Sequence, residues 1–134
     1  MQNMSGGKTA LGLDNNIGAL ICYIGNLVCA LGLIYSIIVI VTDKTNRLPR
    51  FHAFQSVLLS VTGLILFIPM YIVSIGLAFM NSTITSLLAF VIGLAMMLVG
   101  LALFVFTIIA AIKAFNGEMY KIPVVGNFAE KYSA

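Results

Sequence analysis

Charged residues are scarce in this sequence of 134 amino acids. Only 8% of the residues are Asp, Glu, Lys or Arg, whereas 61% are hydrophobic. A soluble domain carries about 25% charged residues, and a water-soluble chain of this size could not cover so much apolar surface. This composition excludes an ordinary soluble domain and predicts an all-α integral membrane protein whose principal partner is the lipid bilayer.

Motifs that carry chemistry are missing as well. The sequence has no HExxH zinc motif, no glycine-rich phosphate loop and no CxxC pair. Cys22 and Cys29 would lie about 10 Å apart along one helix, which is too far for a disulfide. The apolar runs also lack the central ionisable residues that ion-coupled transporters need. We therefore expect no metal site, no catalytic residue and no enzymatic activity.

The chain has few basic residues, and they lie outside the apolar runs. The net charge is only +3, and no basic stretch is long enough to follow a phosphate backbone. This distribution favours contact with anionic lipid headgroups and argues against nucleic-acid binding.

Three uncharged runs are long enough to cross a bilayer, which requires about 20 apolar residues. They predict spans over 17–41, 57–79 and 86–112, with a kink at Pro69 in the second. The long segment 51–80 either crosses once or is re-entrant. The predicted organisation is a polar N-terminal tail (1–16), one three-span transmembrane domain (17–115) and a cytoplasmic surface tail (116–134).

The surface tail contains one helical pattern. Val125, Phe128, Ala129 and Tyr132 follow an i, i+3, i+4, i+7 spacing, which predicts a short amphipathic helix on the membrane surface.

The basic residues predict the orientation. With three spans, the first loop and the C-terminal tail share one side, and the other side carries only Lys8. The basic residues on the shared side are Lys44, Arg47, Arg50, Lys113, Lys121 and Lys131. The positive-inside rule then predicts a three-helix bundle with its N-terminus outside and its C-terminus inside. We expect this bundle in the cytoplasmic (inner) membrane of a bacterium.

Small residues form rows along two of the expected spans. Because lipid is as apolar as a Leu side chain, helices in a bilayer associate through such small residues. The predicted packing seam comprises Gly18, Cys22, Gly25, Cys29, Gly32 and Ser36 in the first span, with Gly93 and Gly100 in the third. The seam either holds a monomeric bundle together or docks a partner membrane protein.

His52, the single histidine, lies at the start of the second apolar segment. We interpret it as a structural hydrogen-bonding residue. The alternatives are a pH sensor or an axial ligand to a haem or chlorophyll-type tetrapyrrole; otherwise we expect no cofactor.

Two segments resemble the signatures of a known family. Residues 50–56 (RFHAFQS) look like R-F-H-A-x-Q-[AS], and residues 114–123 (AFNGEMYKIP) look like A-x-x-G-E-x-Y-x-I-P. Both are typical of a bacterial family of small polytopic membrane proteins of unknown function. That family is similar to the twenty-kilodalton component of the chloroplast inner-envelope protein translocon. The resemblance covers roughly residues 14–129 and implies a membrane location, whereas the plastid relatives have four spans.

Both motifs fall on the side predicted to be cytoplasmic. We expect Arg50, His52, Gln55, Glu118 and Tyr120 to form a polar cluster that ties the tail to the second span.

The sequence favours a non-enzymatic accessory or scaffold subunit of a larger membrane complex. One alternative is a transport or channel component similar to the plastid translocon. Another is a pigment- or haem-associated subunit of a photosynthetic or electron-transfer complex that uses His52.

Overall fold

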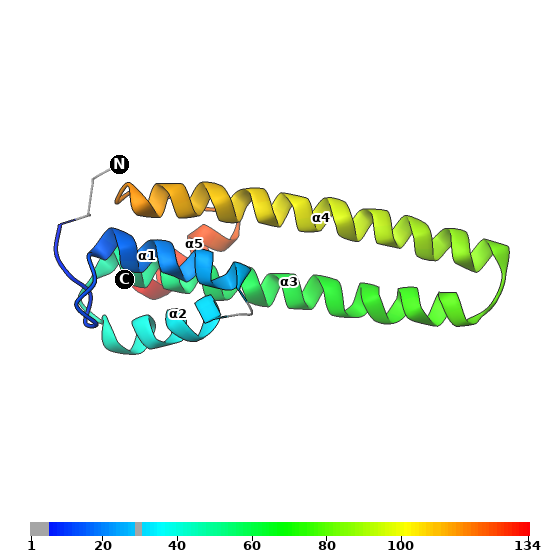
Figure 1. The fold of residues 1–134 in the computed structure, drawn as a ribbon, viewed down its shortest axis with the longest axis horizontal. Helices are drawn as coiled ribbons and strands as arrows, with labels where there is room; N and C mark the ends of the chain where they lie inside the picture. The colour runs from blue at the N-terminus through cyan, green and yellow to red at the C-terminus, as the bar shows by residue number, and fades with distance from the viewer. Residues whose placement is uncertain (1–5, 29–30) are drawn as a thin grey trace. The chain divides into compact units, whose positions relative to one another are not determined.

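The computed structural model describes residues 6–28 and 31–134, and every regular element in them is helical (Figure 1). The elements are α1 (Asn15–Ile24), the 3-10 turn η1 (Gly25–Leu27), α2 (Leu31–Thr42), α3 (Arg47–Phe79), α4 (Thr83–Phe115) and α5 (Val125–Ser133). The chain divides into two compact units. The first comprises residues up to 60 together with 106–134, and the second comprises residues 61–105.

Two of the helices, α3 and α4, are long and apolar enough to cross a membrane. Each has 33 residues, so each is about 50 Å long at 1.5 Å per residue. They contain the expected spans 57–79 and 86–112. Helix α3 begins earlier than expected because Pro49 lies in its first turn, where the missing N–H of proline removes no helical hydrogen bond. The helix also continues through Pro69.

The first apolar run does not form the single helix expected over 17–41. Helix α1 has 10 residues and α2 has 12, so neither reaches the roughly 30 Å of a bilayer core. The chain reverses direction between η1 and α2, and α1 packs against α2 (Figure 1). Two glycines allow this close approach, because a Cβ on Gly25 would lie 2.6 Å from the Cα of Gly32. We call α1, η1 and α2 together the helical hairpin.

The N-terminal segment lies beside the loop that follows the hairpin. The Ala10 N–H donates to Asp43 Oδ1 (2.7 Å), and the Asn46 side-chain amide donates to the Lys8 carbonyl (2.6 Å). The segment is also folded on itself, since the Thr9 N–H donates to the Leu13 carbonyl. Residues joined by direct hydrogen bonds cannot lie on opposite faces of a membrane. The structure therefore does not confirm the predicted placement of the N-terminus across the membrane from the first loop.

Helix α4 ends in a motif set by Gly117. The Gly117 N–H donates to the Ala114 carbonyl and the Glu118 N–H donates to the Lys113 carbonyl, which is the Schellman arrangement. Gly117 has φ +74°, a conformation that favours glycine. The glycine in the second sequence motif thus turns the chain out of α4 and into residues 118–124.

The tail closes with α5, the short helix expected from its periodicity. Its small residues Gly126, Ala129 and Ser133 are buried, whereas Phe128 and Tyr132 are exposed. Just before it, Val124 has φ +68° and ψ −61° and the Val125 N–H donates to the Pro123 carbonyl, which together form a strained γ-turn. The helix therefore packs through its small residues and leaves its aromatic side chains exposed.

In the second unit, the later part of α3 faces the early part of α4. Phe67 approaches Gly100 closely enough that a Cβ there would lie 3.5 Å from its ring, an ordinary contact. A Cβ on Gly93 would have nothing within 4 Å. The turn between the helices has Asn81 at φ 51°, a conformation that asparagine tolerates well.

Candidate functional site

A buried polar network joins α1, α3 and the tail. Tyr23, His52 and Gln55 have no exposed surface. His52 Nε2 lies 2.9 Å from the Glu118 carbonyl, which can only accept a hydrogen bond, so Nε2 carries the proton. His52 Nδ1 is then an acceptor for the Tyr23 hydroxyl at 2.8 Å. The histidine is thereby fixed as one neutral tautomer.

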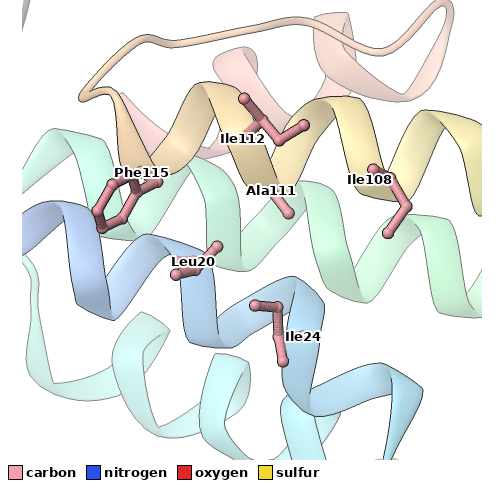
Figure 2. Close-up of a pocket in the computed structure, with 6 residues that line it drawn as sticks. All are labelled: Leu20, Ile24, Ile108, Ala111, Ile112 and Phe115. Atoms are coloured by element: carbon pink, nitrogen blue, oxygen red, sulfur yellow. The ribbon is translucent and has the colours of Figure 1, made fainter.

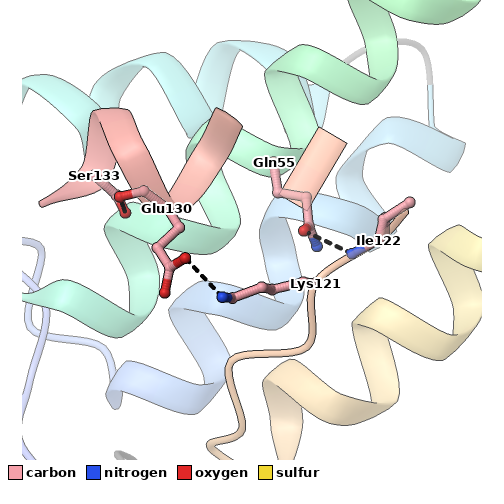
Figure 3. Close-up of polar contacts among 5 residues, drawn as sticks. All are labelled: Gln55, Lys121, Ile122, Glu130 and Ser133. Atoms are coloured by element: carbon pink, nitrogen blue, oxygen red, sulfur yellow. Dashed lines mark hydrogen bonds and ion pairs between the residues drawn. The ribbon is translucent and has the colours of Figure 1, made fainter. Parts of the chain in front are cut away.

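Gln55 completes the network. Its Nε2 donates to the Tyr23 hydroxyl (2.8 Å) and to the Tyr120 carbonyl (3.0 Å), and its Oε1 accepts the Ile122 N–H (3.0 Å). Figure 3 shows the last of these bonds, between α3 and the tail. Every donor and acceptor of the amide group faces a partner that fits its role. One glutamine therefore holds two main-chain positions of the tail.

Aromatic rings enclose His52. The rings of Phe51 and Tyr23 pack edge-on against it, with centroids 5.1 and 5.5 Å away. A metal or tetrapyrrole ligand would have to break one of its two hydrogen bonds, and this geometry gives the ligand alternative no support.

The structure brings part of the predicted polar cluster together. His52 and Gln55 meet the main-chain carbonyls of Glu118 and Tyr120, not their side chains. The Glu118 carboxylate instead pairs with Lys113 at 2.8 Å. Arg50 lies outside the network, because its Nη1 donates to the Lys44 carbonyl and its guanidinium lies over the Phe54 ring. The motif residues thus act largely through the backbone of the tail.

Tyr23 is the network residue that the sequence motifs do not predict. It belongs to neither motif and lies in an apolar run, where it reads as an ordinary packing residue. Its polarity within that run was the available signal, since a buried tyrosine hydroxyl generally needs a partner.

A second polar group lies where the hairpin meets α3. The Asn26 side-chain amide donates to Ser56 Oγ (2.7 Å) and Ser60 Oγ (3.1 Å). Ser56 Oγ donates in turn to the Cys22 carbonyl at 2.6 Å. These bonds fix the end of α1 against α3, which agrees with the general role of polar residues as contacts between membrane helices.

The predicted seam is not one straight face, because the hairpin divides it. Gly25 and Gly32 face each other inside the hairpin. Gly18 packs against the Thr9 side chain, and Cys22 Sγ donates to the Gly18 carbonyl. Ser36 is fully buried, and Cys29 lies outside the described residues.

An apolar groove lies between α1 and the C-terminal part of α4 (Figure 2). Its volume is about 340 Å³. The lining residues are Leu20, Ile24, Ile108, Ala111, Ile112 and Phe115. Ala111 is nearly buried, whereas Ile24, Ile112 and Phe115 are about half exposed. The groove thus has large apolar walls around one small residue.

The described residues contain no group of three or more His, Cys, Asp and Glu side chains that could hold a metal ion. The side chains of Asn26, His52 and Gln55 are engaged in structural hydrogen bonds. These features define a small helical membrane protein. It has two long apolar helices, a helical hairpin and a tail that hydrogen bonds attach to α3.

Comparison with known proteins identifies its family. The chain belongs to the MamF/MmsF family, described as the magnetosome magnetite crystal formation protein family, whose model matches residues 14–129. A UPF0132 membrane protein of Methanocaldococcus jannaschii is 36% identical over 127 residues, covering 95% of this chain and 96% of the relative. A second from the same organism is 33% identical over 123 residues, covering 92% and 73%.

A UPF0132 membrane protein of Archaeoglobus fulgidus is 30% identical over 107 residues, covering 80% of this chain and 89% of the relative. No solved structure matches the chain. These three relatives are archaeal, so they do not support the expected bacterial source. The comparisons also show no link to the chloroplast translocon, and the family they show is one of small membrane proteins of unknown function.

Proposed function

We propose that this protein is a non-enzymatic scaffold subunit that presents a docking groove for a helix of a partner membrane protein. The groove between α1 and α4 carries the proposal. Its lining is entirely apolar, and Ala111 would let a partner helix come close between the larger side chains. The polar residues near it support a structural role, because the His52 network uses its donors and acceptors internally.

The proposed membrane arrangement follows from the hairpin. Helices α3 and α4 cross the bilayer, and the hairpin enters and leaves from one side. The N-terminal segment, the 43–46 loop and the tail then share that side. All seven Lys and Arg residues lie in the first unit, and the second unit has no charged residue. By the positive-inside rule the shared side is the cytoplasmic one.

The groove is tested by photocrosslinking in native membranes. A photoreactive amino acid replaces Ile24 or Ile112 in the groove. Ile37 on α2 serves as the matched control, because it is also about half exposed and does not line the groove. We expect a discrete protein adduct from both groove positions and none from the control. Adducts with lipid alone at all three positions would refute the docking role. A crosslinked dimer of this chain would show that a second copy, and not another protein, occupies the groove.

A second candidate is a transport component, and the hairpin favours it specifically. Hairpins that enter a membrane without crossing it occur where they are buried in protein or line a water-filled path. Asn26, Ser56 and Ser60 place polar groups at the end of this hairpin. Reconstituted protein should then pass small solutes through liposomes, and Asn26→Leu should reduce the flux. Liposomes that stay as tight as protein-free ones would exclude this role.

A further inference from the structure

A pocket with two basic residues lies between the start of α3 and the end of α5. Lys44, Thr45 and Arg47 line one side, and Ser133 and Ala134 line the other. The pocket has a volume of about 360 Å³. It differs from the α1–α4 groove in having charged walls.

Neither cation at this pocket belongs to an ion pair of the described residues. Within residues 6–28 and 31–134, the ion pairs are Lys113 with Glu118 and Lys121 with Glu130. Figure 3 shows Glu130 reaching toward Lys121. The other nearby carboxylate, Asp43, is buried and accepts the Ala10 N–H. Neither of these carboxylates forms an ion pair with Lys44 or Arg47.

The loop that carries these cations is held in place. The Asp43 N–H donates to the Val39 carbonyl, and Asn46 donates to the Lys8 carbonyl. Arg50 donates to the Lys44 carbonyl at 3.1 Å. A ligand that binds here therefore meets a loop whose backbone is already ordered, which reduces the entropic cost of binding.

We infer that this pocket binds an anionic phosphate group. The Lys44 ammonium and the Arg47 guanidinium would supply charge-assisted hydrogen bonds, and the Thr45 hydroxyl could donate a third. Helix α3 begins at Arg47, so the positive end of its dipole lies at the same wall. The phosphate belongs either to the headgroup of an anionic lipid or to a soluble phosphate compound. The inference does not depend on the scaffold role.

The test uses the full-length protein in nanodiscs and in detergent. Binding of short-chain phosphatidylglycerol, phosphatidylcholine and inorganic phosphate is measured for the unaltered chain and for Lys44→Gln/Arg47→Gln. The matched control is Lys8→Gln/Lys131→Gln, which removes the same charge from two residues that do not line the pocket. Thermal melting of each variant checks its folding. Thr45→Trp fills the pocket without changing the charge.

We expect Lys44→Gln/Arg47→Gln to weaken phosphatidylglycerol binding at least tenfold, since each basic residue near a membrane surface contributes about 1 kcal/mol. Thr45→Trp should also weaken it, and the control should not. Selective loss of phosphatidylglycerol with no binding of inorganic phosphate identifies a lipid headgroup. Inorganic phosphate binding that is lost in the same variant identifies a soluble source. Equal losses in the control variant, or no loss in any variant, would overturn the site.

Discussion

At the scale of single residues, His52 accounts for the attachment of the tail to α3. It is fully buried and joins the Tyr23 hydroxyl to the Glu118 carbonyl. The Tyr23 hydroxyl, which donates, and the Glu118 carbonyl, which accepts, thus both depend on the His52 ring. Removing the ring would leave both partners unpaired in a buried site, which is more costly than losing a solvent-exposed bond.

We predict that His52→Ala releases the tail. The change should lower the free energy of unfolding of the first unit by about 3 kcal/mol, from the lost bonds and the cavity. Limited proteolysis should then cut near Tyr120 and Lys121 faster than in the unaltered chain. Arg50→Ala is the matched control, because Arg50 lies two residues away and outside the network. Equal cleavage of the two variants would contradict the account.

Much of this residue-scale picture can be predicted from the sequence, but not all of it. The motifs indicate that His52 and Gln55 meet Glu118 and Tyr120, and the structure places the main chain of both beside them. A sequence motif describes side chains, so it does not reveal that Glu118 and Tyr120 contribute their main-chain carbonyls. Tyr23 was not predicted for a different reason, since it lies in an apolar run and belongs to neither motif.

At the scale of elements, the hairpin is the feature that composition does not predict. Residues 17–41 contain no charge, and hydropathy alone treats them as one span. The break depends on two glycines whose mutual contact lets α1 and α2 touch. The spacing of small residues was visible, but the same spacing suits contact within a hairpin and contact between helices. Helices α3 and α4 were predictable because no glycine pair interrupts them in this way.

We predict that Gly32→Leu opens the hairpin. The new side chain would collide with the backbone of Gly25, which cannot move without displacing α1. The Asn26 bonds to Ser56 and Ser60 should then be lost, and the protein should melt at a lower temperature. Gly93→Leu is the matched control, because a Cβ at Gly93 meets nothing within 4 Å. Melting points that fall equally in both variants would show that the effect is not specific to the hairpin.

At the scale of the whole molecule, the hairpin is the basis of the proposed membrane arrangement. A single span over 17–41 would separate Lys8 from the other six basic residues. The hydrogen bonds from Ala10 to Asp43 and from Asn46 to Lys8 instead keep the N-terminal segment with the first loop. The number of basic residues on the two sides of the membrane then changes from six against one to seven against none. Our central claim is that the N-terminus, this loop and the tail share the cytoplasmic face.

Cysteine accessibility at three positions tests that claim most directly. Lys8→Cys, Thr45→Cys and Lys131→Cys are each exposed to a membrane-impermeant maleimide, first outside intact cells and then after permeabilisation. The unaltered chain, whose Cys22 is buried, gives the background. The account predicts that all three positions are protected in intact cells and labelled together after permeabilisation. Labelling of position 8 in intact cells while positions 45 and 131 stay protected would restore the three-span arrangement and contradict the hairpin.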